Sequence, residues 1–182
     1  MHRLQWQIAV LTLVVVTSLG AVRAQTTVQA RVDALVTFSE KDNQAALAAM
    51  KTLGESLGPT TAYPERRHYL DALVSMQVDA AQVDAAQASV TELREWATRY
   101  QDEVGRLQAE THAAELLTLS GQTSAAATQL EALTPRVTAT RNANVQWHFY
   151  RALGNAQLTL GRFEAALDST FKAMPLAKEI SP

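Results

Sequence analysis

The clearest hydrophobic pattern lies near the carboxyl end of the chain. Apolar side chains recur three or four residues apart from Phe149 to Leu160, which is the spacing of one face of an α-helix. Gly161 follows, and glycine tolerates the left-handed backbone that commonly ends a helix. A second apolar stripe comes next, formed by Phe163, Ala166, Leu167, Phe171 and Ala173. We therefore predict two antiparallel helices joined by a short turn at Gly161.

This pattern repeats along the chain with a fixed period. Shifting the sequence by 40 positions aligns two adjacent alanine columns, and a third column follows seven positions after the second. The columns are Ala45, Ala85, Ala125 and Ala165; then Ala46, Ala86, Ala126 and Ala166; then Leu53, Leu93, Leu133 and Ala173. A helical hairpin buries its apolar face only against its neighbours, so such a repeat favours stacking. We predict an all-α fold, an α-solenoid of about four antiparallel hairpins, with units near 27–66, 67–106, 107–146 and 147–182.

Residues 1–24 have the pattern of a signal peptide. His2 and Arg3 form a short basic start, an apolar run extends over residues 8–19, and small or compact residues precede a cleavage site after Ala24. Cleavage there leaves residues 25–182 as a repeat domain in the periplasm or secreted. The alternative is an uncleaved inner-membrane anchor at residues 6–22, which has only the minimum length for a span. Counting back from Tyr150 by whole periods starts the first unit near Thr27, which agrees with cleavage.

Composition and charge narrow the function classes. The chain has no cysteine, which excludes disulfides, thiolate metal sites and a cysteine nucleophile. The leader carries two basic residues and no acidic one, which leaves 14 basic against 18 acidic residues in the mature chain, a net charge of −4. Nucleic-acid binders show a basic footprint instead, so we expect no nucleic acid among the partners.

The last unit resembles a tetratricopeptide repeat. That family carries an aromatic residue, then Leu-Gly, a turn glycine, an aromatic two residues later, and alanine at two later points. The matching residues are Tyr150, Leu153, Gly154, Gly161, Phe163, Ala166 and Ala173. The earlier units match mainly in period, and this period exceeds the family's usual repeat of about 34 residues, which predicts longer helices.

Three departures from the family pattern stand in the last unit. Gln157 occupies the place of a first-helix tyrosine, Thr170 the place of a second-helix aromatic, and the late proline is missing. Pro135 and Pro175 instead share a column three residues earlier. Because proline lacks a backbone N–H, we expect the second helices of the last two units to kink or restart there.

The resemblance also implies a binding groove on the first helices of the hairpins. Carried over by register, its lining is Arg31, Leu35, His68, Asp71, Ser75, Gln108, Thr111, Glu115, His148, Arg151 and Asn155. Such a groove holds an extended peptide or a neighbouring helix, and a plain solvated helix face is the alternative. Too few lysines and arginines line it for the carboxylate clamp of chaperone-binding relatives.

No catalytic or metal-binding constellation stands out. We find neither two histidines nor a His–Glu pair on one helical turn, and no glycine-rich phosphate loop or serine nucleophile motif. We therefore expect no enzyme activity, no cofactor and no metal. The function we predict is a periplasmic protein–protein interaction scaffold that binds a peptide or protein through the groove.

One alternative is an input region of a larger signalling protein. A leader followed by helical repeats resembles the amino-terminal part of membrane-bound diguanylate cyclases, whose output domain is absent from this chain. No polar capping helix follows the last unit, so its apolar residues face solvent or a further neighbour. Self-association through this uncapped hairpin is a second possibility.

Overall fold

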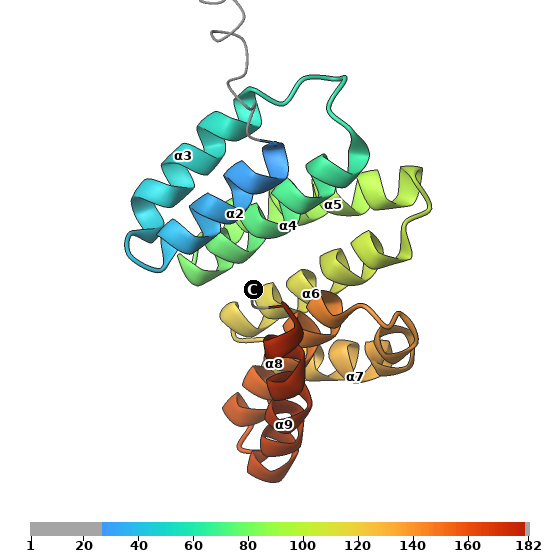
Figure 1. Ribbon diagram of the computed structural model, residues 1–182. Coiled ribbons are helices and arrows are strands. Elements are labelled where there is room, and N and C mark those ends of the chain that lie inside the picture. Colours follow the sequence, from blue (N-terminus) through green and yellow to red (C-terminus); the bar gives the residue numbers. More distant parts are fainter. Residues whose placement is uncertain (1–26, 181–182) are drawn as a thin grey trace, which may run out of the picture.

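The computed structural model describes residues 27–180, and these form eight α-helices without any strand (Figure 1). The helices are α2 (Val28–Ser39), α3 (Asn43–Glu55), α4 (Tyr63–Asp79), α5 (Val83–Arg99), α6 (Glu103–Leu119), α7 (Thr123–Ala139), α8 (Ala143–Thr159) and α9 (Phe163–Ile180). The predicted all-α solenoid of about four hairpins is confirmed. The proposed leader, residues 1–24, lies outside the described residues. None of the described helices is both long and apolar enough to cross a membrane.

The repeat period consists of two helices, each offset from the next by 20 positions. From α4 to α8 each helix has 17 residues, and each begins 20 positions after the one before. The turns place one residue in the left-handed region every 20 positions, at Ala81, Gln101, Gly121, Arg141 and Gly161. The turn predicted at Gly161 is confirmed, with the amide of Gly161 bonded to the carbonyl of Leu158 and that of Arg162 to Gln157.

The hairpins stack so that each first helix after α2 lies between two second helices. Helices α4, α6 and α8 contact the preceding second helix (α3, α5 and α7) as well as the preceding first helix (α2, α4 and α6). The first helices therefore form one continuous layer, which we call the first-helix face. This arrangement brings side chains that are one full period apart in the sequence close together in space.

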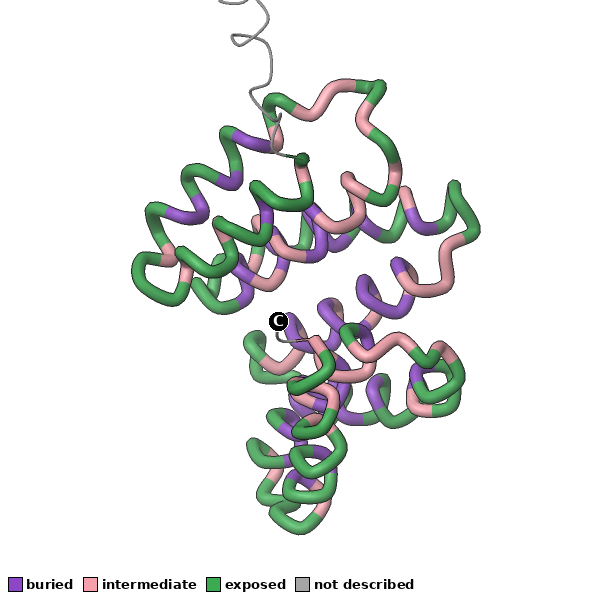
Figure 2. The backbone as a smooth tube through the Cα atoms, in the orientation of Figure 1, coloured by how far each residue is buried: buried purple, intermediate pink, exposed green. Residues whose placement is uncertain are grey.

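Two apolar clusters form the core, and α6 contributes to both. One cluster lies between α2 and α5 and contains Met50 and Val74, while the other lies between α6 and α8 and contains Leu130 and Phe149. Buried backbone positions follow the inner sides of these helices (Figure 2). In α9 only Ala166 and Ser169 are buried, so this helix packs on one neighbour and leaves most of its surface open.

The expected restart at the two prolines is wrong. Helix α7 continues through Pro135 and α9 through Pro175. The residues four positions earlier, Glu131 and Phe171, are exposed, so water can bond the carbonyl that each proline leaves without its helical donor.

Candidate functional site

A buried polar network lies at the centre of the first-helix face. We call it the His112 network, and its members are Asp71 of α4, Gln108, His112 and Glu115 of α6, and Arg151 of α8. The three α6 residues lie on one side of that helix because they are four and three residues apart. Asp71 and Arg151 lie two periods apart, so the stacking of hairpins places one on each side of α6.

Every carboxylate oxygen of the network has a partner. The Nε2 atom of His112 lies 3.0 Å from Oδ1 of Asp71, and its Nδ1 atom lies 2.8 Å from Oε2 of Glu115. Gln108 donates to the other oxygen of Asp71 at 2.7 Å, and Arg151 donates to the other oxygen of Glu115 at 2.9 Å. The network therefore joins three consecutive hairpins through four hydrogen bonds.

Burial and pairing set the charges of this network. Burial by itself lowers the pKa of His112, but the hydrogen bonds to Asp71 and Glu115 outweigh it and raise that pKa to about 9. Burial by itself raises the pKa of Asp71 and of Glu115, but the bonds to His112 hold both below their usual values. At neutral pH two cations then face two anions, which compensates the cost of burying them.

His148 borders the network without bonding to it. Its ring lies 6.0 Å from the ring of His112 and 4.8 Å from that of Trp147, edge-on in both cases. Burial lowers the pKa of His148. A neutral ring beside the charged His112 avoids placing two imidazolium cations side by side.

The network lacks a group that is free to react. Both ring nitrogens of His112 are engaged, so neither is available to abstract a proton or to bind a metal. Within residues 27–180, no three histidine, aspartate or glutamate side chains are grouped to hold a metal ion. The arrangement links α4, α6 and α8 through paired side chains.

The structure brings only part of the predicted groove together. Asp71, Gln108, Glu115 and Arg151 belong to the network, and Thr111 is buried beside it. His68 lies on α4 like Asp71, but its Nε2 atom is 2.7 Å from Asp33 of α2, outside the network. Ser75 is half-buried in α4, and Arg31 and Leu35 line a separate hollow between α2 and α3.

His112, the residue at the centre, was not among the predicted site residues. The statement that no histidine and glutamate share a helical turn is wrong, because His112 and Glu115 are three residues apart on α6 and lie 2.8 Å from each other. The family register directed attention to the neighbouring Thr111. The signal that could have found His112 was its spacing from Gln108 and Glu115, which places all three side chains on one side of α6.

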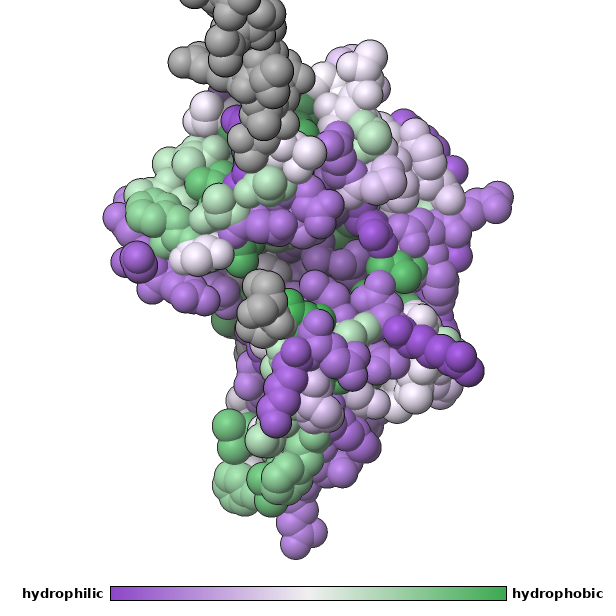
Figure 3. Space-filling model, viewed as in Figure 1, coloured by the Kyte–Doolittle hydropathy of each residue, from purple (hydrophilic) through white to green (hydrophobic). Residues whose placement is uncertain are grey.

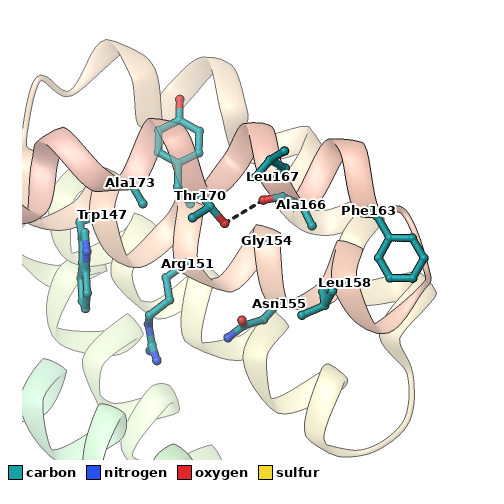
Figure 4. Close-up of a pocket in the computed structure, with 11 residues that line it drawn as sticks. Trp147, Arg151, Gly154, Asn155, Leu158, Phe163, Ala166, Leu167, Thr170 and Ala173 are labelled. Carbon is teal, nitrogen blue, oxygen red and sulfur yellow. Dashed lines mark hydrogen bonds between the residues drawn. The ribbon is translucent and has the colours of Figure 1, made fainter.

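The open part of the first-helix face lies where α8 meets α9. A pocket of about 350 Å³ opens there (Figure 4). Its lining consists of Trp147, Tyr150, Arg151, Gly154, Asn155, Leu158, Phe163, Ala166, Leu167, Thr170 and Ala173. Arg151 and Asn155 extend from α8 to the same side, and Asn155 is exposed. Apolar surface gathers over this end of the molecule (Figure 3), where Leu158, Phe163, Leu167, Phe171 and Met174 are all more than half exposed.

The candidate site therefore has two parts of different character. The His112 network fills the middle of the first-helix face with the protein's own side chains. The α8–α9 pocket remains open, with an apolar wall and the polar side chains of Arg151, Asn155 and Thr170. Comparison with protein-family models, with curated proteins and with solved structures gives no match, so the site is interpreted from its geometry alone.

Proposed function

We propose that this protein is a non-catalytic interaction scaffold, exported to the periplasm, that binds a protein or peptide through the first-helix face at its α8–α9 end. The observation that carries the proposal is the α8–α9 pocket. There the apolar side chain of Leu167 is 56% exposed beside the polar groups of Arg151 and Asn155. Exposed apolar surface with a polar rim is typical of sites that bind proteins.

The His112 network supports a binding role over a catalytic one. Its acids and bases neutralise each other, whereas a catalytic acid or base needs an atom directed at a substrate. The network also joins the hairpins that carry the pocket, since Arg151 belongs to both. A rigid support of this kind keeps a binding surface in one shape before the partner arrives.

A photo-crosslinking experiment in the periplasm of the native host tests the proposal. A photoreactive amino acid replaces Asn155 in the pocket, and in a matched control it replaces Thr128, which is exposed on α7. We expect a discrete adduct with one protein from position 155 and none from position 128. The same adducts from both positions, or none from position 155, would contradict a partner at this face.

A second candidate function is the input region of a membrane-bound signalling protein of the diguanylate cyclase type. The uncovered apolar side of α9, with Phe171 61% exposed, favours it because a following segment could pack there. The genomic reading frame beyond the codon of Pro182 tests this candidate. A frame that continues into a membrane span and an output domain is the expected result, and an immediate stop codon removes the candidate.

A further inference from the structure

The surface of α8 and α9 that forms the pocket has an equivalent one repeat earlier, on α6 and α7. That equivalent surface is covered by α8. Subtracting 40 from the pocket positions gives positions on α6 and α7, the two helices that α8 packs against. Most of these positions are buried, and examples are Thr111, Ala114, Glu115, Ala126, Ala127 and Leu130. Ala127 is 1% exposed whereas its counterpart Leu167 is 56% exposed. The pocket is thus the equivalent of a helix-binding site that is filled elsewhere in the same molecule.

The earlier second helices confirm this equivalence. Met50 of α3, Val90 of α5 and Leu130 of α7 share one register position and are fully buried. Each of these helices contacts the first helix of the next hairpin. At the same position α9 has Thr170, which is exposed. Three of the four second helices in residues 27–180 therefore carry a covering helix on this side, and α9 has none within that range.

The covering helices show which side chains the site accepts. Tyr69 of α4 packs against Gly54 of α3, and the carbonyl of Met76 accepts a bond from Asn43 of α3. Helix α8 directs its corresponding side at α6 and α7 with four buried apolar residues, Val145, Phe149, Ala152 and Ala156. Their spacing of four, three and four residues is that of an amphipathic helix.

The polar side of the pocket adds a charge requirement. Arg151 lies two repeats after Asp71, at the same register position. The carboxylate of Asp71 is hydrogen-bonded to Gln108 and His112 of its covering helix, α6. The Nε atom of Arg151 is buried without a hydrogen-bond partner, while the side chain is 30% exposed. A covering helix would therefore place an acceptor, best a carboxylate, where α6 places His112 or Gln108.

A second copy of this chain does not match that chemistry in a head-to-tail arrangement. Its free first helix is α2, and α2 has the exposed Gln29 at the register position of Tyr69, Ala109 and Phe149. A polar amide there would be buried against the apolar side of α9 without a partner. The chemistry of the site thus disfavours α2 of a second copy as the covering helix.

We infer that the α8–α9 pocket binds an amphipathic helix of another protein, which packs antiparallel to α9 as α8 packs on α7 and offers a carboxylate to Arg151. The inference rests on the proposed scaffold function and specifies the class of its partner as a helix, in contrast to an extended peptide. The apolar residues of such a helix follow the spacing of Val145, Phe149, Ala152 and Ala156.

The first test uses a peptide copied from α8, because α8 already fills the equivalent site. The probe is a labelled peptide of residues 143–159 carrying His148→Glu, which places a carboxylate opposite Arg151. We expect saturable binding by fluorescence anisotropy and a gain of helical circular dichroism in the peptide. Burial of one leucine is worth about 1.5–3 kcal/mol, so the protein variant Leu167→Glu should bind at least ~10-fold more weakly.

Two controls make this test specific. The protein variant Leu119→Glu changes a leucine that is exposed away from the pocket and should bind like the unchanged protein. A peptide with His148→Lys should bind more weakly than the glutamate peptide, because a cation then faces Arg151. Equal binding of the glutamate peptide to the Leu167→Glu and Leu119→Glu proteins overturns the inference.

A second experiment removes the dependence on peptide affinity. Residues 141–180 are repeated directly after Ile180, so that the repeat continues in register and a copy of α8 follows α9. We expect slower amide hydrogen exchange in α9 than in the original chain. Unchanged exchange in α9 shows that the pocket does not take a helix and overturns the inference even if the peptide binds elsewhere.

The remaining outcomes separate the inference from the proposed function. A concentration-dependent dimer by sedimentation that Leu167→Glu dissociates would make a second copy the occupant, which overturns a helix from another protein. If the unchanged protein does not bind the peptide but the adduct from position 155 still forms in the Leu167→Glu protein, the helix inference fails and the scaffold function stands. If Leu167→Glu removes both the adduct and the binding of the peptide, both are supported.

Discussion

The Nε2 atom of His112 in α6 lies 3.0 Å from Oδ1 of Asp71 in α4, in the preceding hairpin. This contact connects two hairpins through a side chain that is only 1% exposed. The opposite nitrogen of the same ring contacts Glu115, which in turn holds Arg151 of the next hairpin. Since the ring is the shared partner of both carboxylates, we expect the stability of the array to depend on it.

Removing the imidazole should destabilise the protein strongly. His112→Ala leaves two buried carboxylates each with one partner fewer, and breaking a buried ion pair costs about 3–5 kcal/mol. Urea denaturation followed by circular dichroism measures this loss. His68→Ala is the matched control, because its pair with Asp33 is partly exposed and such pairs contribute at most about 1 kcal/mol. A similar loss in both variants would contradict the central role of His112.

Stability should be highest near pH 6.5 and fall on both sides. The pKa of His112 is raised from 6.5 to about 9, so its contribution is complete below 6.5 and is lost as the pH rises through 9. The pKa of His148 is lowered from 6.5, so stability also falls as the pH drops below 6.5. The lowered pKa values of Asp71 and Glu115 extend this loss to more acidic solutions.

The alkaline side of that profile has a direct check. One proton held only by the folded state changes the free energy of unfolding by at most about 1.4 kcal/mol per pH unit. Urea denaturation at several pH values between 6.5 and 9 should show a decline within this limit, and His112→Ala should flatten it. A decline that is as steep in the variant would assign the effect to another group.

Gly54 should not tolerate a side chain. A Cβ atom at this position would overlap the phenol of Tyr69, which crosses from α4 onto α3. We expect Gly54→Ala to lower the free energy of unfolding by about 1–3 kcal/mol, the usual cost of overpacking, although alanine is the better helix former. Gly58→Ala is the control, because its nearest neighbour would be 4.0 Å away. Thermal unfolding measures the stability of both variants. An equal loss in Gly54→Ala and Gly58→Ala would argue against the close contact.

Replacing Ser169 alone should destabilise the protein more than replacing Ser169 and Gln157 together. The hydroxyl of Ser169 donates to the side-chain oxygen of Gln157 at 2.7 Å between α9 and α8, and both residues are buried. Ser169→Ala leaves the amide oxygen without this donor, and we expect a loss of about 1–3 kcal/mol. Ser169→Ala combined with Gln157→Leu should recover most of that loss in chemical denaturation. An additive double variant would show that the bond contributes no coupling energy.

Several features of the fold could be predicted from the sequence because they depend on local periodicity. The two apolar stripes on either side of Gly161 indicated two helices joined by a turn, and the columns that include Ala126 and Leu133 indicated that this hairpin repeats. The left-handed residues Ala81, Gln101 and Arg141 gave no comparable signal, since they adopt that conformation under the constraint of the flanking helices. The even spacing of the helices, at half the repeat period, therefore became visible only in the structure.

The candidate site depended on tertiary structure to a greater degree. Sequence register placed Asp71, Gln108, Glu115 and Arg151 on one face, and the structure brings them together there. Register could not show that His112 would turn between two carboxylates or that the middle of the face would be filled, because both follow from the distance and angle at which α4, α6 and α8 pack. The sequence by itself determined that helices repeat and which sides are apolar. Only the packing of the hairpins decided which polar residues neutralise one another and that the open surface lies between α8 and α9.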